Sequence, residues 1–196
     1  MKKILFVGNS YTYYNDMPEA LLVPMAEAAG FPCQVTAVTR GAWTLSKFAD
    51  PNDEEGARLR ETVAGQHYDW VILQEQSLRP VVDPDAFFRG VEDLKTLLAP
   101  QTERFLLYAT WGRKPGSGKL EELGMTSEEM TDRLAEAYEE AGSRFGMEVA
   151  HVGRAFAAYG AAHPEEELYH PDRSHPSAGG SAIAAETLLA ELMKNP

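Results

Sequence analysis

Three side chains at opposite ends of the chain have the types that nucleophilic hydrolysis requires. Ser10 follows an apolar run closed by glycine and asparagine, whereas Asp172 and His175 lie three residues apart near the other end. A serine hydroxyl becomes an effective nucleophile when a histidine accepts its proton and a carboxylate orients that histidine. We therefore predict Ser10 as the nucleophile, His175 as the general base and Asp172 as the orienting acid.

The spacing of the second motif suits this chemistry. In an irregular loop, an acid three residues before a histidine can fold back to a ring nitrogen. Pro176 follows the histidine and Ser177 is expected to cap the last helix, so the base would be held between a proline and a helix start.

A tetrahedral oxyanion also needs hydrogen-bond donors aimed at it. The candidates are the backbone N–H groups of Ser10 and Gly41 and the side-chain amide of Gln74. Glycine at position 41 would let the backbone approach a ligand closely. The alternative roles are a turn for Gly41 and a structural polar side chain for Gln74.

Three aromatic residues are candidates for substrate binding: Tyr11, Trp43 and Trp111. Tyr11 is adjacent to the predicted nucleophile. Trp43 and Trp111 lie on loops that follow predicted strands, where their rings could stack on a sugar. Packing is the alternative role for each of them.

Strand and helix patterns alternate between these residues. The predicted strands cover residues 4–7, 34–38, 70–73, 104–108 and 148–152. The predicted helices run over about 17–29 with Asp16 as N-cap, then follow Asp53, Asp83, Thr126 and Ser177. This alternation favours right-handed crossovers and a parallel sheet covered on both faces.

We predict a flavodoxin-like three-layer α/β/α sandwich, formed by one domain over residues 1–196. Its five parallel strands are expected in the order 2-1-3-4-5. Ligands bind outside the carboxyl ends of such strands. Ser10, Gly41, Gln74 and Trp111 all follow predicted strands, so they should meet at one edge of the sheet.

Composition limits the partners and the compartment. The 196 residues carry a net charge of -12, which argues against nucleic acid and anionic membranes as partners. Cys33 is the one cysteine, so no intramolecular disulfide forms. The apolar run over 4–7 is too short for a signal-peptide core or a membrane span, and a cytoplasmic protein is expected. Nothing in the sequence predicts the oligomeric state.

The two end motifs together resemble those of the SGNH (GDSL-type) hydrolases. The segment Val7-Gly8-Asn9-Ser10-Tyr11-Thr12 matches the block that carries the nucleophile after the first strand. Gly41 matches the oxyanion glycine after the second strand, and Asp172 to Pro176 matches the Asp-x-x-His-Pro block. More narrowly, the chain resembles a bacterial branch with Gly-Asn-Ser-Tyr-Thr and Leu-Gln-Glu-Gln-Ser segments. The resemblance spans nearly the whole chain.

One block departs from the family pattern. The third block is usually Gly-x-Asn-Asp, whose asparagine donates to the oxyanion, whereas this chain has Gln74-Glu75-Gln76-Ser77. Sialate O-acetylesterase-like relatives similarly carry a glutamine at the end of this strand. Gln74 can supply the same amide donor from a longer side chain, and Gln76 is the alternative.

The resemblance implies a serine esterase that acts through an acyl-enzyme on a small acyl ester, with an acetyl group on a carbohydrate as the first substrate hypothesis. It implies no organic cofactor and no metal; the spacing of His163, His170, Asp172 and His175 fits no zinc pattern. Two alternatives are a catalytically silent carbohydrate-binding protein on the same scaffold and a flavodoxin-like FMN binder. The FMN reading leaves Asp172 and His175 without a role.

Overall fold

Five parallel strands form one sheet in the part of the chain that the computed structural model describes, residues 1–102 and 104–194. Their order is β2-β1-β3-β4-β5, and every neighbouring pair is parallel, which confirms the predicted topology. The strands are β1 (Lys2–Gly8), β2 (Cys33–Thr39), β3 (Trp70–Leu73), β4 (Phe105–Tyr108) and β5 (Glu148–Ala150).

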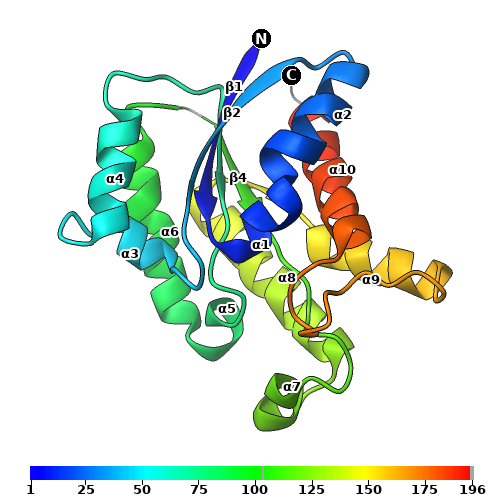
Figure 1. Ribbon diagram of the computed structural model, residues 1–196. Coiled ribbons are helices and arrows are strands. Elements are labelled where there is room, and N and C mark those ends of the chain that lie inside the picture. The colour runs from blue at the N-terminus through cyan, green and yellow to red at the C-terminus, as the bar shows by residue number, and fades with distance from the viewer. Residues whose placement is uncertain (103, 195–196) are drawn as a thin grey trace.

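Helices cover both faces of this sheet and form the outer two layers of the sandwich (Figure 1). One face packs against α3 (Leu45–Ala49), α4 (Glu54–Val63), α6 (Pro84–Leu98) and α8 (Ser127–Phe145). The other packs against the π-helical turn η2 (Met17–Leu22), α2 (Val23–Ala28), α9 (Val152–Ala162) and α10 (Ala178–Lys194). The short helices α5 (Arg79–Val82) and α7 (Gly118–Leu123) lie beyond the carboxyl ends of the strands.

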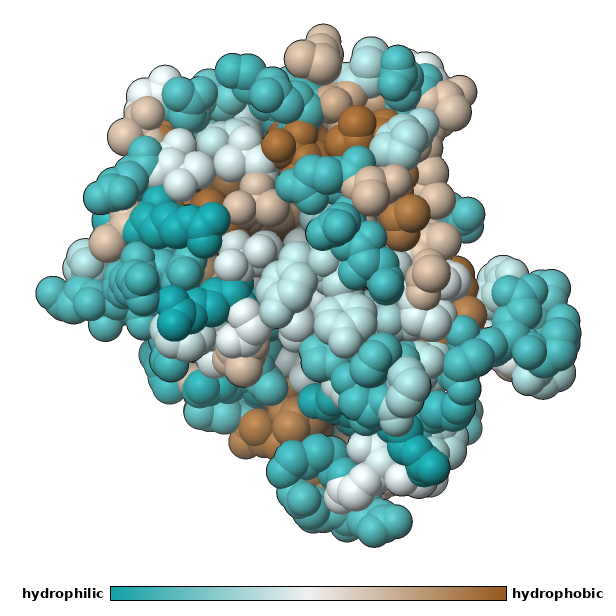
Figure 2. Space-filling model, in the orientation of Figure 1, coloured by the Kyte–Doolittle hydropathy of each residue, from teal (hydrophilic) through white to brown (hydrophobic). Residues whose placement is uncertain are grey.

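The two cores explain why the strands read as apolar runs. Ile4 and Phe6 point into the core beneath α10, whereas Leu5 and Val7 point into the opposite core beneath α4 and α6. All four side chains are buried, because each face of the sheet carries a helix layer. On the side shown in Figure 2 the surface is mainly hydrophilic, with smaller hydrophobic patches, one of them over α5. Among the described helices, none combines the length and apolarity that crossing a membrane would require.

Three predicted helix starts are confirmed by their caps. The Asp53 side chain accepts a hydrogen bond from the N–H of Glu55, and the Asp83 side chain accepts one from the N–H of Ala86. Thr126 forms a reciprocal capping box with Glu129.

The first helical region differs from the prediction. Helical turns begin at Ser10, as α1 (Ser10–Tyr13) and a 3₁₀ turn over Tyr14–Asp16, and precede η2. Asp16 is not a capping side chain: its φ is 50° and it makes no capping hydrogen bond. The chain kinks between α1 and η2, where Asn15 has a φ of 56°. Asn15 holds this kink, because its amide donates to the Pro176 and Ser177 carbonyls and to the Ser181 hydroxyl.

The fifth strand is shorter than predicted, because Val152 begins α9, a helix that the sequence patterns did not reveal. Its glycines and alanines give a weak apolar stripe. Gly153 is required where α9 crosses the end of β4, since a Cβ atom there would lie 2.2 Å from the Thr110 carbonyl oxygen. Five short segments, α1, the 3₁₀ turn, α3, α5 and α7, were likewise not predicted.

Candidate active site

Ser10 lies where β1 ends and α1 begins, in a turn fixed by its neighbour Asn9. The Asn9 side chain caps α1 by accepting from the N–H of Tyr11 (3.2 Å) and donates to the Trp43 carbonyl (3.1 Å). The Asn9 backbone N–H donates to Gln74 Oε1 (2.9 Å). The turn that carries the serine is therefore tied to the loop after β2 and to the end of β3, and Ser10 is half-buried at the carboxyl edge of the sheet.

The structure brings Ser10, His175 and Asp172 together in one hydrogen-bonded chain. Ser10 Oγ lies 2.8 Å from His175 Nε2, and His175 Nδ1 lies 2.6 Å from Asp172 Oδ2. The other carboxylate oxygen, Oδ1, accepts from the backbone N–H groups of Ser174 and His175, both at 2.9 Å. The loop before α10 thus folds back on itself as predicted and runs beside α1 (Figure 1).

These contacts keep the Asp172 carboxyl ionised. Burial alone would raise its pKa, but the hydrogen bonds from the His175 ring and from the two backbone N–H groups outweigh that effect and hold the pKa well below its usual range. A carboxylate that accepts from Nδ1–H fixes the tautomer in which Nε2 is free to accept a proton. His170 also approaches this carboxylate, with Nδ1 at 3.1 Å from Oδ2.

Aromatic rings hold the histidine from two sides. Tyr14 stacks on the His175 imidazole, with ring centres 4.5 Å apart and planes 13° apart, and Tyr11 meets it edge-on at 5.5 Å. Tyr11, Tyr13 and Tyr14 follow Ser10 in the sequence and suggest aromatic contacts near the nucleophile. The sequence alone did not reveal which of them contacts His175.

Two of the predicted substrate-binding aromatics are packed into the core. The Trp111 ring is 1% exposed and lies between Tyr11 and Phe156, with stacked centres 4.7 Å apart on both sides. Tyr11 is 3% exposed and its hydroxyl bonds to Ser174 Oγ (2.9 Å). The prediction that a sugar ring stacks on Trp111 is therefore wrong, because both faces of its ring are covered. The ring belongs to a column that supports the loop carrying His175, because Trp111 Nε1 donates to the Ser174 carbonyl.

Trp43 lies near the turn, and its half-buried side chain already makes other contacts. Its Nε1 donates to Asp53 Oδ1 (2.9 Å), and the Arg40 guanidinium and the Lys47 ammonium lie 4.4 Å and 3.9 Å from the ring centre. The backbone carbonyl, not the ring, contacts the serine turn through Asn9.

Gln74 and Gln76, the two alternatives for the side-chain oxyanion donor, occupy different places. Gln74 is 1% exposed, and its Oε1 accepts from the Asn9 N–H and the Thr12 hydroxyl while its Nε2 donates to the Glu75 carbonyl. Gln76 is half-buried, and its Oε1 accepts from the N–H groups of Leu78 and Arg79. Both ends of the Gln74 amide thus make hydrogen bonds beneath the turn, whereas Gln76 lines the pocket beside Ser10.

The pocket around Ser10 has a volume of about 380 Å³. Gly41 lines it together with Ser10 and Gln76, so the candidate oxyanion donors share one space with the hydroxyl. A larger cavity of about 710 Å³ lies on the far side of Trp111, against α8 and α9, and contains none of the residues of the Ser10–His175–Asp172 chain. Among the described residues that line it, no histidine stands beside a serine.

Solved structures share this architecture over nearly its full length. A protein of Slackia heliotrinireducens assigned to the SGNH hydrolases superimposes with a TM-score of 0.84 and 33% sequence identity, covering 97% of this chain and 98% of that one. This chain belongs to the SGNH hydrolase family. The predicted membership is thereby confirmed.

Two more distant structures share the fold. They are Axe2, an acetylxylan esterase from Geobacillus stearothermophilus (TM-score 0.69, 18% identity, 97% and 94% of the two chains), and a lipase/acylhydrolase from Enterococcus faecalis (0.71, 18%, 99% and 96%). No protein-family model and no curated protein sequence matches the chain.

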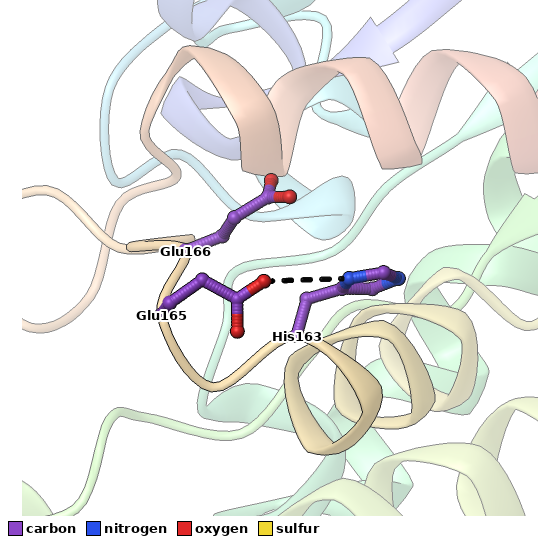
Figure 3. Close-up of side chains that lie close together, drawn as sticks. All are labelled: His163, Glu165 and Glu166. Carbon is purple, nitrogen blue, oxygen red and sulfur yellow. Dashed lines mark ion pairs between the residues drawn. The ribbon is translucent and has the colours of Figure 1, made fainter.

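In one cluster on this SGNH hydrolase, three possible metal ligands lie close to one another. His163, Glu165 and Glu166 follow α9, and one ligand atom from each lies within 4.8 Å of the others. Figure 3 shows the Glu165 carboxylate facing the His163 ring, 3.7 Å away. The Glu166 carboxylate accepts from the Tyr159 hydroxyl instead. Both glutamates are exposed, and we assign the cluster no catalytic role.

Glu75 is a fully buried carboxyl next to Gln76, which lines the pocket. It accepts hydrogen bonds from the backbone N–H groups of Gln76 (2.5 Å) and Leu45 (3.2 Å). Burial raises its pKa to about 7, against the opposing effect of these two N–H groups and of Arg79. The carboxyl therefore gains its charge near neutral pH, unlike Asp172.

This shift makes stability depend on pH. The folded protein holds the Glu75 proton more tightly than the unfolded chain, so its contribution to stability is complete below the unfolded pKa of about 4.3 and falls as pH rises to about 7. We expect the unfolding free energy of wild type to fall, relative to that of Glu75→Gln, by about 2 kcal/mol between pH 5 and pH 8.

Urea titrations of both proteins at pH 5, 6.5 and 8 measure this difference. Glu61→Gln, on the exposed face of α4, is the matched control and should show no such trend. A difference between Glu75→Gln and wild type that stays constant with pH would show that the Glu75 carboxyl keeps its ordinary pKa in the folded protein.

Proposed function

We propose that this SGNH hydrolase is a serine esterase that cleaves a small acyl ester through an acyl-enzyme, with residues 1–196 acting as one catalytic domain. The observation that carries the proposal is the chain of contacts from Ser10 Oγ through the His175 ring to the Asp172 carboxylate, at 2.8 and 2.6 Å. Nucleophile, base and orienting group are then in hydrogen-bond reach of one another, which is the geometry that activates a serine.

In the first half of the reaction, Ser10 Oγ attacks the acyl carbonyl carbon while His175 Nε2 takes the hydroxyl proton. The negative charge that forms on the carbonyl oxygen is met by the N–H groups of Ser10 and Gly41 and by the Gln76 side-chain amide. The bond to the alcohol oxygen then breaks, and His175 gives its proton to the leaving alcohol.

The second half repeats these roles with water. His175 Nε2 takes a proton from the water that attacks the acyl carbon of acylated Ser10. Collapse of the second tetrahedral intermediate breaks the bond to Ser10 Oγ, which regains its proton from His175, and releases the carboxylic acid. Throughout, the Asp172 carboxylate holds the imidazole ring and stabilises its charged form.

We propose an acetyl group on a carbohydrate as the first substrate class to test. Two features support it: the small volume of the pocket that the acyl group and the alcohol share, and the fold shared with the acetylxylan esterase Axe2. The acyl group must reach Ser10 in a space that Tyr14, Gln76 and His175 also line.

The experiment that tests the proposed reaction combines turnover with trapping. Wild type is expected to release p-nitrophenol from p-nitrophenyl acetate, and a fluorophosphonate is expected to stop this release with one label on the peptide that contains Ser10. Intact and peptide mass spectra of wild type and Ser10→Ala locate the label. Turnover that survives in Ser10→Ala, or a label on another serine, would overturn the proposal; sugar binding without turnover would favour the silent binding protein.

A further inference from the structure

An arginine lines the catalytic pocket although the chain as a whole is strongly acidic. The net charge is -12, yet no aspartate or glutamate is among the described residues that line the pocket around Ser10. Arg113 is the cation in that lining, opposite a set of hydroxyl, amide and imidazole groups. Arg113 is therefore the charged side chain that faces this space, while the Asp172 carboxylate lies behind the His175 ring.

The Arg113 guanidinium has no acidic partner in the described part of the chain. Its Nη2 donates to Ser77 Oγ (2.8 Å), and its Nε is buried without a hydrogen-bond partner. Four other arginines of the chain do pair with carboxylates: Arg40, Arg58, Arg79 and Arg154. A half-buried charge that its own protein leaves unpaired is costly, so a ligand that pairs with it gains affinity.

The position of Arg113 suits a role in substrate binding. Its Cζ lies 5.7 Å from the centre of the Tyr11 ring, and that ring lies 5.5 Å from the ring of His175. One tyrosine ring therefore connects the guanidinium to the base. Arg113 makes no hydrogen bond to Ser10, His175 or Asp172, so it stands beside the reacting groups and not among them.

We propose that Arg113 binds a carboxylate group of the substrate, so that the natural substrate is an anionic ester. The planar guanidinium presents parallel donors that match a carboxylate, which makes arginine the preferred partner for such groups. This inference rests on the proposed esterase function. The carboxylate belongs either to the alcohol, as in an acylated sugar acid, or to the far end of the acyl chain.

Matched ester pairs distinguish these two sources. For the alcohol side, 3-acetoxybenzoate is compared with 3-acetoxybenzamide. For the acyl side, the mono-p-nitrophenyl ester of adipic acid is compared with the ester in which its free carboxyl is a primary amide. In each pair the anion and the neutral molecule have nearly the same shape, so the ratio of their kcat/KM values reports recognition of charge.

Wild type is expected to favour the anion by about ten-fold or more in one pair, and that pair names the side that carries the carboxylate. Arg113→Gln should bring this ratio to about one, Arg113→Lys should keep part of it, and 0.5 M NaCl should lower it in wild type. Arg89→Gln, which removes an exposed arginine of α6, should keep the wild-type ratio.

Ratios near one in both pairs for wild type would overturn the inference without any variant. So would an Arg113→Gln protein that loses rate equally on anionic and neutral esters, since that is the effect of merely holding the Ser77 loop. Calorimetry gives a readout that needs no turnover. If the alcohol-side pair is the one that shows the preference, 3-hydroxybenzoate should bind wild type at least about ten-fold more tightly than 3-hydroxybenzamide, and equal binding then contradicts the role of Arg113. Failure of the esterase proposal is seen separately, as Ser10→Ala hydrolysing the neutral esters at the wild-type rate.

Discussion

We expect the substitutions Ser10→Ala and His175→Ala each to lower kcat for p-nitrophenyl acetate by about 10⁴-fold to 10⁶-fold. Each change removes one end of the 2.8 Å contact through which the serine loses its proton. Asp172→Asn is expected to cost about 10⁴-fold, because a neutral amide neither fixes the Nδ1–H tautomer nor stabilises the imidazolium. Steady-state kinetics with active-site titration of the wild type measures all three.

The controls separate catalysis from folding. Ser143→Ala and His67→Ala change exposed residues away from the pocket and should keep the wild-type rate. Because the triad acts as a unit, the double variant Ser10→Ala/His175→Ala should be no slower than either single variant. A Ser10→Ala protein within ten-fold of wild type, folded by circular dichroism, would remove Ser10 from the reaction.

The strand order could be predicted from strong local signals, whereas the meeting of Ser10 with His175, 165 residues apart, was predicted from triad chemistry and from the family resemblance. Apolar runs such as 4–7 and 70–73 mark strands buried on both faces, and parallel strands place the residues that follow them at one edge. The loop motif needs little more, since its carboxylate closes on its own backbone N–H groups and on the ring three residues away.

The roles of the aromatic residues could not be predicted, because they depend on burial that is set by distant elements. Trp111 follows a strand, so its position in the sequence predicts an exposed residue at the edge of the sheet. In the structure, however, Phe156 of α9 covers one side of its ring. That helix was itself missed, since glycine and alanine give it a weak pattern and the close crossing at Gly153 leaves no sign in the local sequence. The tertiary contact decides the role of the ring, and sequence spacing does not encode it.

The same reasoning explains why two glutamines two residues apart could not be told apart. In a strand, residues two apart point to the same face, but β3 ends at Leu73, so this periodicity does not place Gln74 and Gln76. The hydrogen bonds from the Asn9 N–H and the Thr12 hydroxyl decide which of the two amides is engaged. The Gln74 side chain lies beneath the turn that carries Ser10, and its Oε1 accepts both of these hydrogen bonds. Gln76 is left at the pocket with its oxygen held by two backbone N–H groups.

Replacing Gln76 by alanine is therefore expected to lower kcat by about 10²-fold to 10³-fold, the loss typical of removing one oxyanion donor. Because its Oε1 already accepts from Leu78 and Arg79, Nε2, which has no hydrogen-bond partner among the described residues, is the group that can donate to a developing charge. A contact made mainly in the transition state lowers kcat and kcat/KM together and leaves KM nearly unchanged.

Gln74→Ala provides the contrast that makes this assignment testable. Removing a buried amide leaves the Asn9 N–H and the Thr12 hydroxyl without their acceptor, at a cost of about 1–3 kcal/mol for each unpaired group. Its main effect should be a lower melting temperature. Gln76→Ala should lower the melting temperature less, because the Leu78 and Arg79 N–H groups that lose their acceptor are only partly buried, whereas Asn9 and Thr12 are buried. Kinetics and thermal melts on both proteins measure the two effects. A Gln76→Ala protein with kcat within three-fold of wild type would return the donor role to Gln74, and the transition state would then need the buried amide to turn toward the pocket.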